Sequence, residues 1–285
     1  MLTVGMFPNI KKQNIHTVLD WLMQYFKERN VRVLLPEDAA KELNYPRLAC
    51  DKDAIKEEIS LAITLGGDGT LLNTAREIAP EGIPVCGINM GQLGFLTEIE
   101  LPELSTALDK LIKGEYSVEE RLMLTAVVIR QNQQLYISSA LNDIVVTRGG
   151  LSRMIRLELF IDNELTAKYS ADGLIVATST GSTGYSLSAG GPIINPQLKV
   201  IVITPICPHT LQTRSLVVSE NEEIRISMQA TNHNDIILTI DGQTIYNLLP
   251  EDTVVVKRSP FRSRFIRFAG KSYYEALRTK LRRGD

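Results

Sequence analysis

"ISLAITLGGDGTLLNTA", residues 59–75, is the stretch that decides the first part of the fold. An apolar run ends at a pair of glycines, and a helix-like pattern follows from Thr70. A buried strand that enters a glycine-rich turn and then a helix is the usual unit of a parallel α/β sheet. The amides of such a turn and the positive end of the helix dipole favour bound phosphate. Asp68 stands between Gly67 and Gly69, where its charge repels phosphate, so we expect it to have another role.

The segments around this stretch alternate in the same way over the first hundred residues. Strand-like "LTVGMF", "VRVLL", "LAITL" and "IPVCGI" alternate with helix-like segments such as "IHTVLDWLMQYFKER", which predicts a parallel sheet covered by helices. Later segments are short, β-branched and often alternating, with turn signals between them, as in an all-β unit. The sequence therefore predicts an α/β domain of residues 1–100 and 262–285 and a mainly β domain of residues 101–261. Tyr274, Leu277 and Leu281 recur at helical spacing, so the last helix is expected to return to the first domain.

Composition and charge exclude several classes of protein. The chain has 285 residues, of which 44% are hydrophobic and 22% charged, as in ordinary globular proteins. No apolar run approaches the ~20 residues that cross a bilayer, and no signal-peptide pattern is present, so a cytoplasmic protein without membrane contact is expected. The 3 cysteines form no CxxC pair, which argues against a disulfide framework or a zinc site. The basic segment 262–285 is interpreted as a solvated helix face rather than a nucleic-acid site.

Two interpretations of Asp68 remain open from the residues alone. The stretch lacks GxxxxGK[ST] and the third glycine of GxGxxG, so it is neither of those phosphate loops. Asp68 could cap a helix that starts at Thr70, because Asp is a favourable N-cap residue. It could also be a general base that accepts a proton from a hydroxyl attacking a phosphoryl group.

Two further motifs suit a nucleotide. "TSTGSTGYSLSAGGP", residues 178–192, combines small hydroxyls with one aromatic, Tyr185, which can stack on a purine while the hydroxyls bond its edge. The alternative is a hydroxyl-rich surface loop. Asn142 and Asp143 interrupt a strand-like segment, either as a turn or bulge, or as a pair that binds the two hydroxyls of a ribose.

The order of these motifs resembles the NAD kinase family. "GGDGT", "ND" and "TGSTGYSLSAGGP" contribute to the resemblance, together with "GINMGQLGFLTE" (87–98) and "TPICPHTL" (204–211). GGDGT alone also occurs in diacylglycerol-type lipid kinases and, as GGDGS, in phosphofructokinases, whereas the combination with TGSTGY is specific. The resemblance implies a Rossmann-like first domain and a kinase that phosphorylates the adenosine-ribose 2′-hydroxyl of NAD. It also implies ATP or polyphosphate as donor, a divalent metal such as Mg²⁺ with unassigned ligands, and a homodimer or homotetramer.

Functional residues follow from the resemblance position by position. Asp68 would be the base acting on the 2′-hydroxyl, with Gly67 and Gly69 making room for the nucleotide phosphates. Asn142 and Asp143 match a pair that holds ribose hydroxyls. The remaining matches are Thr183, Tyr185 and Ser188 around the adenine, Gly184 where the family often has alanine, Asp172 near the nicotinamide end, Phe95 along the site, and His209 at the substrate or an interface.

Rival functions are a lipid kinase, which usually has a second Gly-Thr-Gly-Asn-type motif that is missing here, and a catalytically silent dinucleotide sensor. A sensor would not need Asp68 among phosphate-binding glycines.

Overall fold

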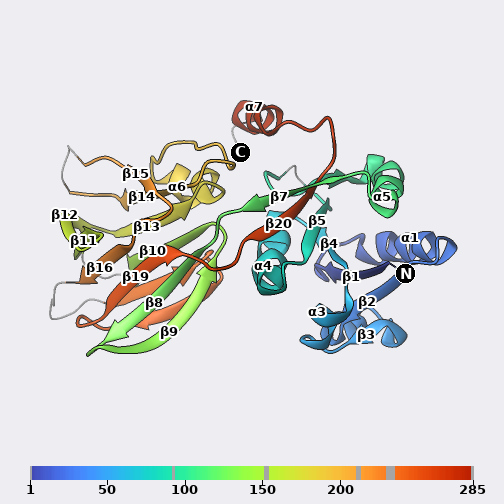
Figure 1. Ribbon diagram of the computed structural model, residues 1–285, viewed down its shortest axis with the longest axis horizontal. Helices are drawn as coiled ribbons and strands as arrows, with labels where there is room; N and C mark the ends of the chain where they lie inside the picture. The colour runs from blue at the N-terminus through green and yellow to red at the C-terminus, as the bar shows by residue number, and fades with distance from the viewer. Residues whose placement is uncertain (1, 92–93, 151–153, 210–212, 229–234, 284–285) are drawn as a thin grey trace. The chain divides into compact units, whose positions relative to one another are not determined.

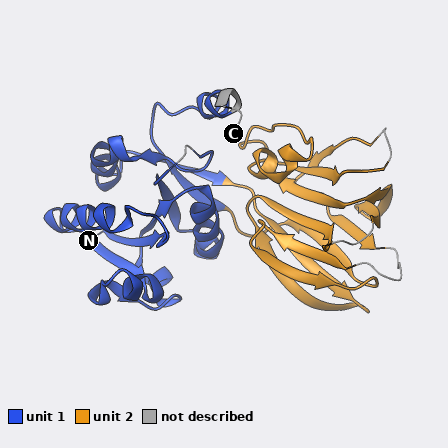
Figure 2. Cartoon of the chain, turned by 180° about the vertical axis from the view of Figure 1, so that it is seen from behind, with its two compact units in different colours: residues 1–120, 263–285 blue, residues 121–262 orange. Residues whose placement is uncertain are grey.

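A computed structural model of the protein describes residues 2–91, 94–150, 154–209, 213–228 and 235–283 (Figure 1). The chain divides into two compact units, unit 1 with Met1–Glu120 and Ser263–Asp285, and unit 2 with Arg121–Arg262 (Figure 2). Within the described residues, no helix is long and apolar enough to cross a membrane.

Unit 1 is an α/β unit built on a largely parallel sheet. Its strands are β1 (Thr3–Pro8), β2 (Arg32–Pro36), β3 (Ala49–Cys50), β4 (Leu61–Gly66), β5 (Pro84–Asn89), β6 (Ile99–Glu100), β7 (Ser117–Arg121) and β20 (Ser263–Arg267). Its helices are α1 (Ile15–Glu28), α2 (Glu37–Glu42), α3 (Ala54–Glu58), α4 (Asp68–Ile78), α5 (Leu104–Lys113) and α7 (Tyr273–Arg283), with 3₁₀ turns η1 (Pro46–Leu48), η2 (Ala79–Glu81) and η3 (Leu101–Glu103).

The strand order of this sheet is β3-β2-β1-β4-β5-β20-β7, with β6 also paired to β5. Strands β1, β2, β4, β5 and β20 pair in parallel. Leu19, Leu22 and Phe26 recur along one side of α1 and are fully buried in the core of unit 1. That spacing of three to four residues aligns them on one helix face, which covers the sheet.

Unit 2 is mainly β. Its strands are β8 (Leu124–Arg130), β9 (Gln133–Ala140), β10 (Asp143–Arg148), β11 (Ile155–Ile161), β12 (Glu164–Ala171), β13 (Gly173–Thr178), β14 (Val200–Ile206), β15 (Leu216–Ser219), β16 (Ile224–Met228), β17 (Ile236–Ile240), β18 (Thr244–Leu248) and β19 (Thr253–Arg258). Between β13 and β14 lie the 3₁₀ turn η4 (Gly181–Thr183) and the short helix α6 (Tyr185–Ser188).

These strands form two antiparallel sheets that share a core. The orders are β15-β14-β13-β10-β17-β18 and β12-β11-β16-β19-β8-β9. Alternate residues are buried, as in β16 with Ile224, Ile226 and Met228, because successive side chains of a strand point to opposite faces. Ile175 on β13 belongs to a second buried cluster against which Ile194 packs, so the segment that follows α6 covers the outer face of this sheet.

The fold class expected from the sequence is confirmed. Residues 101–120, which the sequence pattern groups with the β-rich part, lie in unit 1 because α5 buries Leu104, Leu108 and Leu111 in the core of that unit. Helix α7 also belongs to unit 1. Tyr274, expected in its buried stripe, is 63% exposed.

Candidate active site

Asp68 lies where β4 passes into α4. Every residue of β4 is buried, and Asp68 is the first residue of α4, two positions earlier than the pattern from Thr70 predicts. Gly67 is the N-cap residue and provides no side-chain cap. The half-buried Asp68 side chain therefore stands at the positive end of the helix dipole, at the carboxyl end of a parallel strand.

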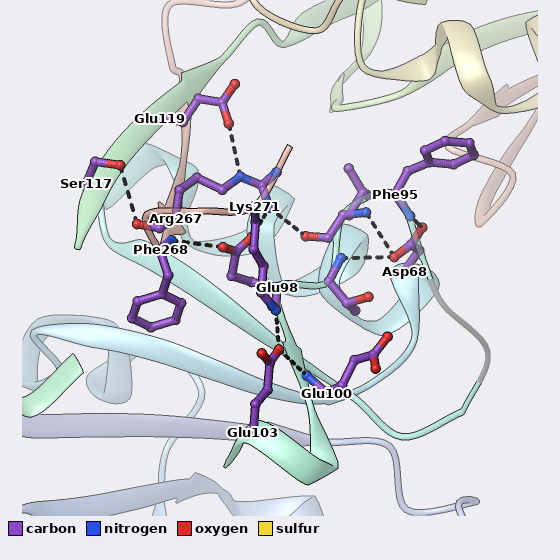
Figure 3. A network of polar contacts seen from close by, with 12 residues as sticks. Asp68, Phe95, Glu98, Glu100, Glu103, Ser117, Glu119, Arg267, Phe268 and Lys271 are labelled. Carbon is purple, nitrogen blue, oxygen red and sulfur yellow. Dashed lines mark hydrogen bonds and ion pairs between the residues drawn. The ribbon is translucent and has the colours of Figure 1, made fainter. Parts of the chain in front are cut away.

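The carboxylate of Asp68 binds a loop from another part of unit 1 (Figure 3). Its Oδ2 accepts the N–H of Phe95 at 2.6 Å, and its Oδ1 accepts the N–H groups of Leu96 and Thr97 at 3.1 Å each. Asp68 thus holds the 95–97 loop rather than capping its own helix. An ionised carboxylate has about four acceptor positions. Contacts between the described residues occupy three of these acceptor positions, and the fourth, on Oδ2, is left for a ligand.

The glycines of this region have different roles. A Cβ added at Gly67 or Gly69 would meet no described heavy atom within 4 Å, so there is room for a ligand at the side-chain position of both residues. A Cβ at Gly94 would lie 1.8 Å from Oδ1 of Asp68. Gly94 is therefore what lets the loop approach the carboxylate, a role that the sequence analysis missed although "GQLGF" contains the signal.

Phe95 is half-buried beside this carboxylate. The Nζ of Lys280, on α7, lies 4.3 Å from the centre of its ring, a distance suited to a cation–π interaction. Helix α7 thus contacts the same loop that donates its amides to Asp68.

In unit 2, Asn142 and Asp143 lie where the chain enters β10. The carboxylate of Asp241 accepts the N–H groups of Leu141, Asn142 and Asp143 at 3.0, 2.7 and 3.0 Å. Asp241 follows β17 with a left-handed φ of 52°. Its side chain fixes the backbone of the pair, a function that sequence analysis missed because the Asp-Gly of "TIDGQT" also marks an ordinary hairpin turn.

Asp143 is 5% exposed. Burial, followed by the nearby charge of Asp241, raises the pKa of Asp143 to about 7. Near neutral pH its carboxyl can therefore donate a hydrogen bond when protonated or accept one when ionised.

The hydroxyl-rich motif separates into a buried half and an exposed half. The hydroxyl of Thr178 donates to the carbonyl of Leu141 at 2.6 Å and accepts the N–H of Gly181 at 3.0 Å. A Cβ at Gly181 would lie 2.0 Å from the carbonyl oxygen of Asn142, so only glycine permits this approach. The buried hydroxyls therefore hold the turn against the Asn142–Asp143 segment.

The exposed half carries the residues that the resemblance assigns to adenine. Tyr185 is 47% exposed, Ser188 is exposed and Thr183 is half-buried. A Cβ at Gly184 would stand 3.7 Å from Nδ2 of Asn142 and 3.8 Å from Oδ2 of Asp143. The structure thus brings Gly184 together with Asn142 and Asp143 in unit 2.

Two other expected residues follow strands of unit 2: Asp172 comes directly after β12, and His209 comes after β14. Asp172 forms an ion pair with Arg148, whose Nε lies 2.7 Å from Oδ1, and this hydrogen bond raises the pKa of Arg148. Arg148 is a partner that the sequence analysis did not identify. The backbone N–H of His209 donates to the carbonyl of Ser170 at 2.8 Å, and the His209 side chain is exposed.

Gly67, Asp68, Gly69 and Phe95 belong to unit 1, whereas the other expected residues belong to unit 2. Among the described residues, no group of three or more His, Cys, Asp or Glu side chains could hold a metal ion.

Comparisons with known proteins identify the family of the chain. Residues 4–116 match the ATP-NAD kinase N-terminal domain, and residues 141–268 match the ATP-NAD kinase C-terminal domain. The NAD kinase of Moorella thermoacetica is 49% identical over 288 residues, which cover 100% of this chain and 90% of that protein. The NAD kinase of Thermoanaerobacter sp. strain X514 is 43% identical, with 99% of each chain covered.

Solved structures show the same fold. A yeast NADH kinase complexed with NADH superposes with a TM-score of 0.87 at 26% identity, covering 98% of this chain and 86% of that one. An NAD kinase from Archaeoglobus fulgidus, in complex with ATP, gives a TM-score of 0.78 at 24% identity and covers 99% of both chains. The family matches and the relatives confirm the resemblance: the chain belongs to the ATP-NAD kinase family and is a kinase that phosphorylates NAD.

Proposed function

We propose that the protein transfers the γ-phosphoryl group of ATP to the 2′-hydroxyl of the adenosine ribose of NAD, with Asp68 as general base. The 2′-hydroxyl gives its proton to Oδ2 of Asp68, and the 2′-oxygen forms a bond to the γ-phosphorus. The bond from that phosphorus to the β–γ bridging oxygen breaks, so the products are NADP and ADP. A carboxylate in this place acts as a base, because it accepts the proton as the hydroxyl attacks.

The observation that carries this proposal is the hydrogen bonding of the Asp68 carboxylate. Amides of the 95–97 loop fix both oxygens, and the acceptor position that remains in the described contacts is on Oδ2. An added Cβ at Gly67 or Gly69 beside it would meet no described heavy atom within 4 Å, so these glycines leave room for phosphate near the start of α4. Carboxylate and phosphate repel one another, so a hydroxyl is the better partner for this oxygen.

The residues of unit 2 have binding roles in this proposal. Asn142 and Asp143 bind ribose hydroxyls, supported by the fixed backbone at the start of β10. The exposed ring of Tyr185 stacks on adenine with Thr183 and Ser188 beside it. Two assignments rest on the family resemblance alone: Asp172 near the nicotinamide end and His209 at the substrate or an interface. Phe95, in unit 1, lines the site next to the base.

A divalent metal is part of the proposed reaction, although the described side chains form no protein cage for one. Mg²⁺ commonly keeps several waters and is bound through substrate phosphates. We therefore propose that the metal reaches the site with ATP.

The experiment is incubation of the protein with ATP, Mg²⁺ and NAD, with NADP detected by a dehydrogenase that accepts NADP and not NAD. Formation of ADP and NADP in equal amounts supports the proposal. ATP hydrolysis without NADP, or a phosphorylated product that the dehydrogenase does not accept, would contradict it. Replacing ATP with polyphosphate in the same assay decides the donor.

We also propose a homodimer or homotetramer, on the strength of the family resemblance. Light scattering at micromolar concentration should give the mass of two or four chains. The mass of a single chain, in a sample with full activity, would refute this assembly.

A further inference from the structure

A second set of hydrogen bonds holds the loop that binds Asp68. The carbonyl of Leu96 accepts a hydrogen bond from Nη1 of Arg267 at 3.2 Å. This carbonyl and the N–H of Thr97 belong to one peptide group, and that N–H donates to Oδ1 of Asp68 at 3.1 Å. A trans peptide is planar, with its C=O and N–H pointing in opposite directions. Holding the oxygen therefore fixes the direction in which the N–H points at Asp68.

Arg267, on β20, is itself firmly fixed (Figure 3). Its Nη1 lies 2.7 Å from Oε2 of Glu98, and its Nε lies 3.0 Å from Oε2 of Glu119. The other Glu98 oxygen, Oε1, accepts the N–H of Phe268 at 2.8 Å. The Glu98 side chain is 4% exposed and that of Arg267 is 19% exposed, so the buried charges compensate each other. A guanidinium with these partners has little freedom to turn away from Leu96.

The same network continues to the chain segment after β20. The Nζ of Lys271 donates to the carbonyl of Glu98 and to the carboxylate of Glu103. The 95–98 loop is thus bonded on one side to Asp68 and on the other to residues that follow unit 2 in the sequence.

We propose that Arg267 is a positioning residue for phosphoryl transfer, which acts by holding the 95–97 amides in the orientation that fixes the Asp68 carboxylate. This inference rests on the proposed role of Asp68 as base. Arg267 makes no contact with Asp68 itself in the described structure; the peptide between Leu96 and Thr97 connects them. A catalytic group displaced by about 1 Å can lose about 100-fold in rate.

The test compares Arg267→Lys with Arg264→Lys in the full-length protein. Lysine keeps the positive charge between Glu98 and Glu119 but loses the fork that reaches several acceptors. Arg264 is a matched control on the same strand, because its Nη1 also donates to a backbone carbonyl, that of Gly82 at 2.9 Å. Gly82 follows the end of α4 opposite to Asp68. Arg267→Lys should lower kcat by about tenfold to 100-fold with KM for NAD changed less than about threefold, while Arg264→Lys leaves both near wild type.

A double-mutant cycle separates positioning from general structural damage. In an Asp68→Asn background, Arg267→Lys should lower the residual kcat by less than about twofold, because the group it positions is gone. Hydrogen exchange at the amides of Phe95, Leu96 and Thr97 should be faster in Arg267→Lys than in Arg264→Lys. Equal kcat losses in both backgrounds, or unchanged amide exchange, would overturn the inference.

The two proposals fail in different ways. If Asp68→Asn retains wild-type turnover, the base role is wrong, and the exchange measurement still decides whether Arg267 holds the loop. If Asp68→Asn is impaired but the Arg267→Lys effect adds fully to it, only the positioning role is wrong. Should Arg267→Lys fail to fold, Glu119→Ala removes the acceptor of Nε of the same guanidinium, and kcat and amide exchange must change in the same directions by smaller amounts.

Discussion

Asp68→Asn tests the proposed chemistry most directly. Asparagine has one accepting oxygen where the carboxylate has two. With that oxygen turned toward Leu96 and Thr97, its NH₂ group faces the N–H of Phe95, which lies 2.6 Å from Oδ2 in the wild type. Two donors then oppose each other, and an unsatisfied donor costs about 1–3 kcal/mol of folding free energy. A fall of a few degrees in melting temperature is expected alongside the effect on catalysis.

The expected loss of turnover is larger than this structural cost. General bases contribute about 10²–10⁴-fold in rate, or about 3–5 kcal/mol of activation free energy. Turnover should fall by that factor, measured as NADP formation at saturating NAD and ATP at a temperature where the variant is folded. Binding of NAD, measured by calorimetry, should change little.

Asp51→Asn is the matched control for this variant. The carboxylate of Asp51 accepts the N–H groups of Asp53 and Ala54 at 2.9 and 3.2 Å, also in unit 1. Its replacement likewise turns an amide-binding carboxylate into a neutral amide, but away from the glycine-rich turn, so turnover should stay near wild type. Wild-type turnover in Asp68→Asn would refute the base. A loss explained entirely by absent NAD binding or by unfolding would instead support a holding role.

Other substitutions test the remaining parts of the site. Tyr185→Ala should weaken NAD binding by about 1–3 kcal/mol, because base–aromatic stacking contributes that much, and an unchanged dissociation constant removes Tyr185 from the site. Gly94→Ala places a Cβ 1.8 Å from Oδ1 of Asp68, so kcat should fall by about 100-fold with NAD binding retained; normal kcat would show that the loop does not position the acid. Burial, followed by Asp241, raises the pKa of Asp143 to about 7. Its unfolded value is about 3.9, so the folded state binds this proton more tightly, and the resulting stability is complete below about pH 4 and lost as pH rises to about 7. Melting curves without NAD should therefore show the wild type losing up to about 4 kcal/mol relative to Asp143→Asn over that range, whereas parallel curves would contradict the shift.

Local patterns in the sequence predict much of the fold because they report local burial. The apolar run of β4, the helical spacing of Leu19, Leu22 and Phe26, and the alternation in β16 each reflect one buried face. They do not report pairing between distant strands. The insertion of β20 between β5 and β7 is one such pairing, and it could not be derived from periodicity.

The candidate site, too, could be predicted from the sequence only where its residues are neighbours in the chain. Glycines and acids that are neighbours in the chain, such as Gly67 and Asp68, could be identified from the sequence. Asp241 and Arg267 could not, because they act on backbone groups 98 and 171 residues away, at Asp143 and Leu96. The motif at 178–192 shows its hydroxyls without showing which are buried. Packing decides that Thr178 holds a turn while Ser188 is exposed.

The position of β20 in the sheet has a consequence for how the protein is made. A ribosome delivers residues 263–271 only after all of unit 2 has been synthesised. Unit 2 is continuous in sequence, so it can fold as soon as it emerges. The sheet of unit 1, in contrast, lacks β20 next to β5 until residues 263–267 have been made. Arg267 and Lys271 arrive with that strand and the turn after it. The nascent chain therefore acquires its locked 95–98 loop, and with it a fixed Asp68, as one of the last steps of biosynthesis. Under the mechanism proposed above, an unfinished chain is then unable to transfer a phosphoryl group.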